Sequence, residues 1–232
     1  MEWLTLTALE REALVLSLRV AAWCVAASLP LGIAVAWALA RCEFPGKTVL
    51  DGVVHLPLVL PPVVVGYGLL LLLGRQGPLG EWLYDAFGIV VAFTWKGAAV
   101  ASAVMAFPLM VRAIRLSMEA IDPGLEAAAR TLGAGRLGVF ASVTLPLAWP
   151  GLLAGMMLAF ARSLGEFGAT ITFVSTIPGE TRTLPLALYA LVQVPGGEAA
   201  ALRIVVISTV LAFAALIASE LIARRIRARL AG

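Results

Sequence analysis

Long hydrophobic runs dominate the chain, and polar positions gather in the short stretches between them. Five runs reach the roughly 20 apolar residues that a helix needs to cross the hydrocarbon core of a bilayer. A sixth run, residues 184–194, is too short to cross and predicts a re-entrant or interfacial piece. The pattern therefore predicts an all-α integral membrane protein in which residues 1–232 form a single transmembrane domain. The predicted spans are residues 13–40, 50–74, 87–111, 147–170 and 200–223.

Composition supports a membrane protein and excludes several other classes. With 61% hydrophobic and 13% charged residues, the chain has too little charged surface for a soluble domain of its size. The first run is too long for the apolar core of a cleavable signal peptide and follows acidic rather than basic residues. The net charge of +3 comes from basic residues at membrane edges, which is not the pattern of a nucleic-acid-binding surface. One histidine, and two cysteines (Cys24 and Cys42) that cannot readily meet, give no support for a metal site.

The distribution of basic residues predicts the orientation in the membrane. If the N-terminus lies outside, ten basic residues fall on the cytoplasmic side and about four on the other, in agreement with the positive-inside rule. We therefore expect a periplasmic N-terminus and a cytoplasmic C-terminus. The inner group is Arg41, Lys47, Arg112, Arg115, Arg130, Arg136, Arg224, Arg225, Arg227 and Arg229, and the outer group is Arg11, Arg75, Arg182 and Arg203.

A polar insert of about residues 116–146 separates the third and fourth runs. Asp122-Pro123 is typical of a helix start, and Gly133 suits the left-handed residue that follows a helix end. A second short helix is predicted from about Gly135 and should end before Pro146. Two short helices with alanines on the exposed surface would form a knob that a cleft on a partner can grip. An amphipathic hairpin lying in the interface is the alternative.

The same insert resembles the cytoplasmic coupling loop of ABC importer permeases. Gly133, Val143, Leu145 and Pro146 have the spacing of that family, whereas Glu126 lies one place before the family's acidic position, which Ala127 occupies. The resemblance implies that Ala127, Ala128 and Gly133 contact a separate ATPase subunit. It also implies that Leu145-Pro146 sets the angle into the fourth span. The candidate coupling residues are Glu126, Ala127, Ala128, Gly133, Val143, Leu145 and Pro146.

A second resemblance concerns the cargo. The stretches Ala161-Arg-Ser-Leu-Gly-Glu-Phe-Gly-Ala169 and Ile177-Pro-Gly-Glu-Thr-Arg-Thr-Leu-Pro-Leu-Ala-Leu-Tyr189 are similar to the permeases of bacterial molybdate importers. The resemblance implies a homodimeric permease in the inner membrane that works by alternating access. It also implies a periplasmic molybdate-binding protein and a partner ATPase that binds ATP and Mg, so that this chain carries no cofactor and is not an enzyme. Sulfate and tungstate importers of the same family are the alternatives.

Four polar residues near the predicted spans are candidates for the translocation pathway: Lys96, Arg162, Ser163 and Glu166. Ionisable groups within a membrane are costly and therefore indicate either pairing or function. Arg162 and Glu166 lie four residues apart on one helix face, which favours a pair between them over direct contact with an anion. Two rival classes of protein fit the sequence less well. A membrane enzyme would need a constellation of catalytic residues, which this sequence does not contain. A passive channel or ion-coupled carrier has no reason to display a coupling loop.

Overall fold

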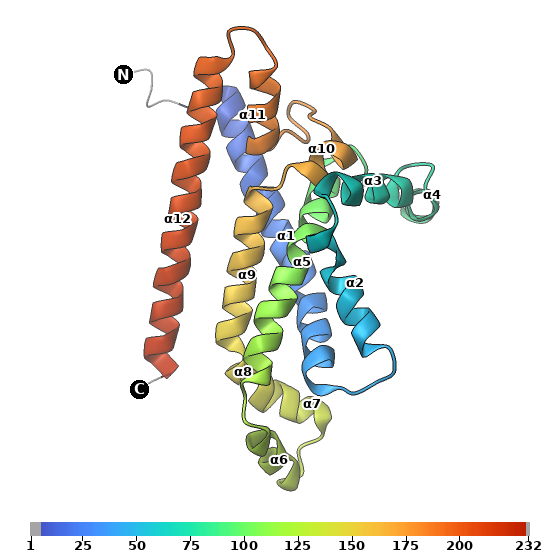
Figure 1. Cartoon of the computed structure of the whole chain (residues 1–232), viewed down its shortest axis with the longest axis vertical. Coiled ribbons are helices and arrows are strands. Elements are labelled where there is room, and N and C mark those ends of the chain that lie inside the picture. The colour runs from blue at the N-terminus through green and yellow to red at the C-terminus, as the bar shows by residue number, and fades with distance from the viewer. Residues whose placement is uncertain (1–5, 231–232) are drawn as a thin grey trace.

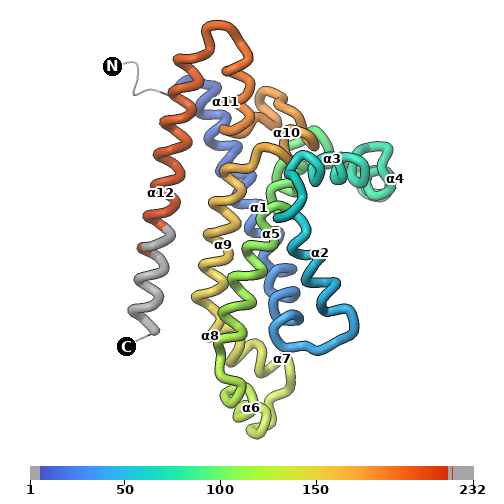
Figure 2. The backbone as a smooth tube through the Cα atoms, in the orientation of Figure 1, coloured from blue at the N-terminus to red at the C-terminus, as the bar shows by residue number. Residues whose placement is uncertain are grey.

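The computed structural model describes residues 6–230, and this part of the chain is helical without any strand. The side chains of residues 219, 220 and 222–230 lie outside the description, among them those of Arg224, Arg225, Arg227 and Arg229. Figure 1 shows the arrangement and Figure 2 traces the backbone. The helices are α1 (Ala8–Arg41), α2 (Lys47–Val59), α3 (Pro62–Leu73), α4 (Pro78–Phe87), α5 (Trp95–Glu119), α6 (Pro123–Thr131), α7 (Arg136–Val139), the π-helical turn η2 (Phe140–Thr144), α8 (Leu145–Leu147), α9 (Trp149–Leu164), α10 (Gly168–Val174), α11 (Leu184–Val192) and α12 (Glu198–Leu230).

Helices α1, α5 and α9 pack against one another and form the core of the bundle. Small residues allow this close approach. A Cβ atom added at Gly155 of α9 would lie 3.0 Å from the Met110 carbonyl oxygen of α5. Around that contact, Cys24, Ala106 and Ile114 are fully buried. The α6 end of the bundle lies at one pole of the molecule, and the start of α1 lies at the other (Figure 1).

The second hydrophobic run is broken into α2 and α3, which meet at an angle of 115°. Leu60 has an extended backbone with ψ 143°, as expected for a residue that precedes proline, and Pro61 and Pro62 cannot donate the hydrogen bonds that a continuous helix requires. As a result α3 and α4 project sideways from the bundle (Figure 1). The next long helix, α5, begins at Trp95, where the Thr94 hydroxyl accepts a hydrogen bond from the Gly97 amide at 3.3 Å.

The segment between α6 and α9 differs from the sequence prediction. The prediction that the second short helix ends before Pro146 is wrong, since α7 continues through η2 into α8, which contains Pro146. In the wide π turn the Leu145 amide donates to the Phe140 carbonyl, and this turn accommodates a proline that has no N–H of its own. The direction then changes by 67° between residues 136–147 and α9.

The number of membrane spans stays a prediction. Three helices among the described residues are long and apolar enough to cross a bilayer: α1, α5 and residues Glu198–Ala218 of α12. The number rises to five if each bent pair, α2 with α3 and residues 136–147 with α9, counts as one span. The short run 184–194 forms α11, a helix of 9 residues.

Candidate functional site

Helix α6 forms where local sequence signals predict it. The Asp122 carboxylate accepts a hydrogen bond from the Gly124 amide at 2.8 Å, and Pro123 occupies the first turn, where its missing N–H costs nothing. At the other end Gly133 adopts the left-handed conformation with φ 91°. Both of these sequence predictions are confirmed.

The exposed face of the α6–α8 segment (residues 123–147), which points away from the bundle, carries several apolar side chains together with Arg130 and Arg136. Ala127 and Ala128 are exposed, as are Leu132 at 89% and Leu137 at 81%. Leu125 and Gly133 are exposed on the same segment.

Glu126 lies on the opposite face of α6 and is only 5% exposed. Its Oε1 accepts from the Arg41 Nε at 3.0 Å and from the Thr144 hydroxyl at 2.8 Å, and Arg130 Nη2 lies 3.8 Å from its Oε2. The structure thus places Glu126 inside, where it joins α6 to the end of α1 and to the end of η2. The family's acidic position, held here by Ala127, is one residue further along and faces outward.

Arg41 extends this connection to α5. Its Nη2 donates to the Met118 carbonyl at 2.7 Å and to the Ile121 carbonyl at 3.2 Å, at the end of α5 and in the turn that follows it. One guanidinium therefore bonds to α6, to α5 and to the turn after α5. We call Arg41, Glu126 and Thr144 the Arg41 node.

Val143, Leu145 and Pro146 lie in the bend that leads to α9. Val143 and Leu145 are half-buried, and Pro146 is exposed. Next to them Phe140 of η2 packs edge-on against Trp37 of α1, with ring centroids 5.7 Å apart. The α6–α8 segment is thus in contact with α1 through both Phe140 and Arg41.

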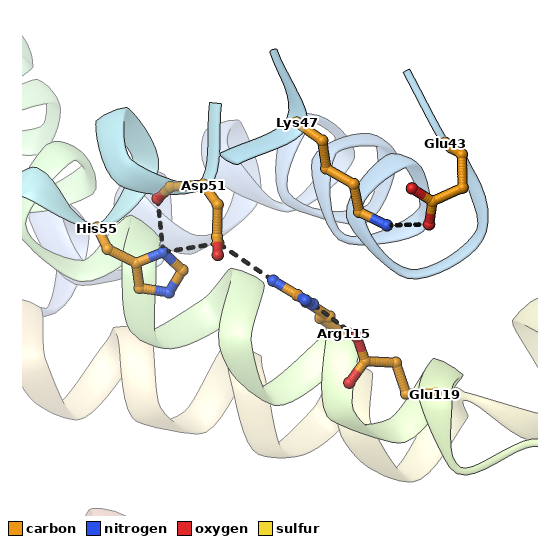
Figure 3. A network of polar contacts seen from close by, with 6 residues as sticks. All are labelled: Glu43, Lys47, Asp51, His55, Arg115 and Glu119. Atoms are coloured by element: carbon orange, nitrogen blue, oxygen red, sulfur yellow. Dashed lines mark hydrogen bonds and ion pairs between the residues drawn. The ribbon is translucent and has the colours of Figure 1, made fainter. Parts of the chain in front are cut away.

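A second charged network joins α2 to α5 near the same end of the bundle (Figure 3). Asp51 Oδ1 of α2 lies 3.1 Å from Arg115 Nη1 of α5, and the Arg115 Nε donates to Glu119 at 2.7 Å. His55 Nδ1 lies 3.1 Å from the same Asp51 oxygen, so the only histidine belongs to a structural cluster. Glu43 and Lys47, 2.7 Å apart, form a separate pair in the same view.

The candidate pathway residues divide into two groups. Arg162 Nη1 lies 2.6 Å from Glu166 Oε2, and Glu166 Oε1 accepts from the Ala169 amide at 2.8 Å. Glu166 is 2% exposed, and it both neutralises Arg162 and caps α10. Ser163, 6% exposed, lies between them in sequence. Lys96 is exposed at the start of α5 and forms no ion pair within residues 6–230.

Sequence reasoning missed Arg41 and Thr144 as the partners of Glu126. Arg41 stands at the end of a hydrophobic run, where arginines ordinarily mark the membrane boundary, and its partner lies 85 positions further along the chain. The available signal was the displaced Glu126, since a carboxylate one position away from the exposed site points inward and then requires a cation.

The sequence matches, over residues 28–228, the family described as binding-protein-dependent transport system inner membrane component. The chain belongs to this family. It is 62% identical to the molybdenum transport system permease protein ModB of Escherichia coli (strain K12), over 97% of this chain and 98% of that protein. It is also 55% identical to ModB of Haemophilus influenzae, over 96% and 97% of the two chains. The sulfate transport system permease protein CysT of Escherichia coli is 42% identical over 78% of this chain and 66% of CysT.

Solved structures of permeases have the same fold. The crystal structure of a bacterial alginate ABC transporter, in complex with an alginate pentasaccharide-bound periplasmic protein, superposes with a TM-score of 0.76 at 18% identity. That match covers 95% of this chain and 80% of the other. Family membership makes this permease a multi-pass inner-membrane component of a transport system, not an enzyme.

Proposed function

We propose that this permease is the membrane subunit of an ATP-driven importer that moves molybdate across the inner membrane by alternating access. The observation that carries this function is the 62% identity to ModB over nearly the whole of both chains. Sulfate is the runner-up cargo, because CysT is related over a shorter region at 42% identity.

The permease works with an ATP-binding subunit and with a periplasmic molybdate-binding protein. The exposed face of the α6–α8 segment docks on the ATPase, which binds ATP and Mg. The opposite pole of the bundle, where α1 begins, faces the periplasm and receives the binding protein. Two permease chains enclose the pathway. Supporting this arrangement, Leu132 and Leu137 are exposed at the α6 end, and most of the basic residues are predicted on that side.

The Arg41 node explains how closure of the ATPases would reorient the spans. Closure of the ATPases moves α6 through its contacts with them, and the buried Glu126 passes that displacement to Arg41 and Thr144. Because Arg41 also bonds to the end of α5, helices α1, α5 and α9 respond together instead of bending one at a time. Ala127, Ala128 and Gly133 supply close contact with the partner, and Val143, Leu145 and Pro146 set the angle of α9.

Uptake of labelled molybdate into proteoliposomes tests this function. The vesicles contain the permease with its ATPase and are supplied with binding protein and ATP, with sulfate and tungstate as competitors. We expect uptake that requires ATP and resists an excess of sulfate. Uptake that sulfate abolishes would assign the permease to sulfate, and uptake without ATP would contradict the coupling role of the α6–α8 segment. A Leu132→Asp/Leu137→Asp variant should lose ATPase binding, since central apolar residues of an interface contribute about 2 kcal/mol or more each.

A further inference from the structure

At the pole opposite α6, we propose that a cavity bordered by Arg11, Arg19 and Arg182 binds a tetrahedral oxyanion. The oxyanion is free molybdate that has been released at the periplasmic face but has not yet entered the pathway. The identity of the cargo and the orientation rest on the proposed function. The cavity and its charges do not.

The cavity has a volume of about 480 Å³ and lies between the first turns of α1 and the loop that joins α10 to α11. One liquid water occupies about 30 Å³, so a tetrahedral oxyanion fits with part of its hydration shell. Residues 8, 11, 12, 15 and 19 follow helical spacing along one stripe of α1, and Pro178 and Gly179 form part of the facing wall.

The charge of this cavity matches a dianion. Three arginines and one carboxylate, that of Glu12, line it, which leaves a net charge of +2. None of these three arginines forms an ion pair with any side chain that the structure describes, in contrast to Arg41, Arg115, Arg162 and Arg203, each of which has a carboxylate partner. The guanidinium groups therefore keep donors available, in the planar arrangement that suits oxyanions.

Two of the three guanidinium groups are held in position by uncharged partners. The Arg19 Cζ lies 3.7 Å from the centroid of the Trp95 ring. The Arg182 Nε donates to the Thr176 hydroxyl at 3.2 Å. Such contacts fix a cation without neutralising it.

The loop of residues 175–183 is itself built to hold Arg182 at the cavity. Thr181 is fully buried, and its hydroxyl donates to the Ser175 carbonyl at 3.1 Å and accepts from the Ile177 amide at 2.8 Å. Ser175 has φ 60°, a conformation that costs energy for a residue other than glycine. The Glu180 carboxylate accepts a hydrogen bond from the Trp95 backbone amide at 3.3 Å. This bond connects the loop to the same tryptophan whose ring packs against Arg19.

The position of the cavity along the membrane normal suits an anion that is dissolved in water. With 34 residues, α1 is about 51 Å long at 1.5 Å per residue, whereas the hydrocarbon core is about 30 Å thick. The helix is therefore long enough for its first turns to lie outside the hydrocarbon, as the proposed orientation requires. The phosphate of an anionic lipid headgroup has the same chemistry and can reach the same height, so the experiment must separate the two sources.

The experiment measures binding of labelled molybdate to the intact permease–ATPase complex in nanodiscs of zwitterionic lipid, without ATP or binding protein. We expect weak, saturable binding that tungstate displaces and that rising salt reduces. Arg11→Ala and Arg182→Ala should each weaken it about tenfold or more, since each removes a charge-assisted hydrogen bond. Arg182→Lys should fall between these variants and the wild type, because the charge remains and the fork is lost. Arg75→Ala is the matched control, because Arg75 also lies on an aromatic ring, 4.5 Å from the centroid of Tyr84, but outside the cavity.

Binding that is absent in the wild type, or unchanged in the Arg11 and Arg182 variants, would overturn the proposal. Arg11 is exposed, so its removal should leave the fold intact, and a melting curve of each variant checks this. A parallel arm adds phosphatidylglycerol and measures retained lipid by native mass spectrometry. Arginine-dependent retention of that lipid without molybdate binding would reject the cargo assignment. Uptake measured separately keeps the two proposals distinct, because molybdate binding can fail here while ATP-driven uptake continues.

Discussion

The α6 end of the bundle and the junction of α3 with α10 are built differently: arginine–carboxylate pairs join helices from distant parts of the sequence at the first, and two backbones meet directly at the second. Arg41–Glu126 and Arg115–Asp51 each bridge two elements at the first end. At the second, a Cβ atom added to Gly66 of α3 would collide with the carbonyl oxygen of Ala169, and one added to Gly168 would lie 2.7 Å from the Pro62 Cβ.

The difference concerns how each contact responds to movement. Hydrogen-bonded ion pairs can exchange partners while the helices shift, and the guanidinium of Arg41 already has three acceptors within reach. A glycine contact has no such alternatives, because the two backbones either fit or clash. We therefore expect the α6 end to tolerate small shifts between helices better than the junction of α3 and α10 does.

The largest effect is expected at the Arg41 node. Arg41→Ala would leave the buried Glu126 with only the more distant Arg130, at 3.8 Å and 61% exposed, and loss of one partner of a buried pair costs about 3–5 kcal/mol. We expect a lower melting temperature in detergent and a loss of ATP-driven uptake. The double variant Arg41→Ala/Glu126→Gln should regain part of the stability, since it removes the stranded charge. If the two substitutions destabilise additively instead, Glu126 and Arg41 do not act as a pair.

A smaller effect is expected at the glycine contact. Gly66→Ala would force α3 away from α10, and overpacking of this kind costs about 1–3 kcal/mol. Gly68→Ala is the control two positions along, because an added Cβ finds nothing within 4 Å there. Thermal unfolding of both variants in raised salt sharpens the comparison. The Gly66 defect should not depend on salt, and a salt-dependent defect would contradict a steric cause.

The smallest effect is expected for Lys47→Ala. Its partner Glu43 has a side chain that is 90% exposed, and such surface pairs contribute about 0–1 kcal/mol. The melting temperature should stay close to that of the wild type. A loss as large as that of Arg41→Ala would show that charge in general, rather than burial and bridging of several elements, stabilises the α6 end.

Sequence alone predicted the features that depend on neighbouring residues. Asp122, Pro123 and Gly133 marked the ends of α6. The 115° bend between α2 and α3 falls inside residues 50–74, which the sequence predicts as one span, and it depends on α3 packing against α10, which lies far along the chain. The π turn at Phe140–Thr144 joins α7 to the helix that contains Pro146. Pro146 indicates a disturbance in this region, but no residue pattern specifies that it takes the form of a π turn. The partners of Glu126 and of Asp51 are likewise distant in sequence, so the hydrophobic periodicity of the chain does not predict them.

The ion pair between the first and the last helix bears on how the chain is assembled. Glu10 of α1 is 2% exposed. Its Oε1 accepts a hydrogen bond from Arg203 Nε of α12 at 2.6 Å, across 193 positions of sequence. During synthesis the carboxylate emerges long before its arginine, and an unpaired carboxylate is costly to bury. It must therefore remain in water until every intervening helix has been inserted. The first residues to leave the ribosome are thus among the last to reach their final position, and a chain that ends before α12 exposes an unpaired charge that distinguishes it from a finished one.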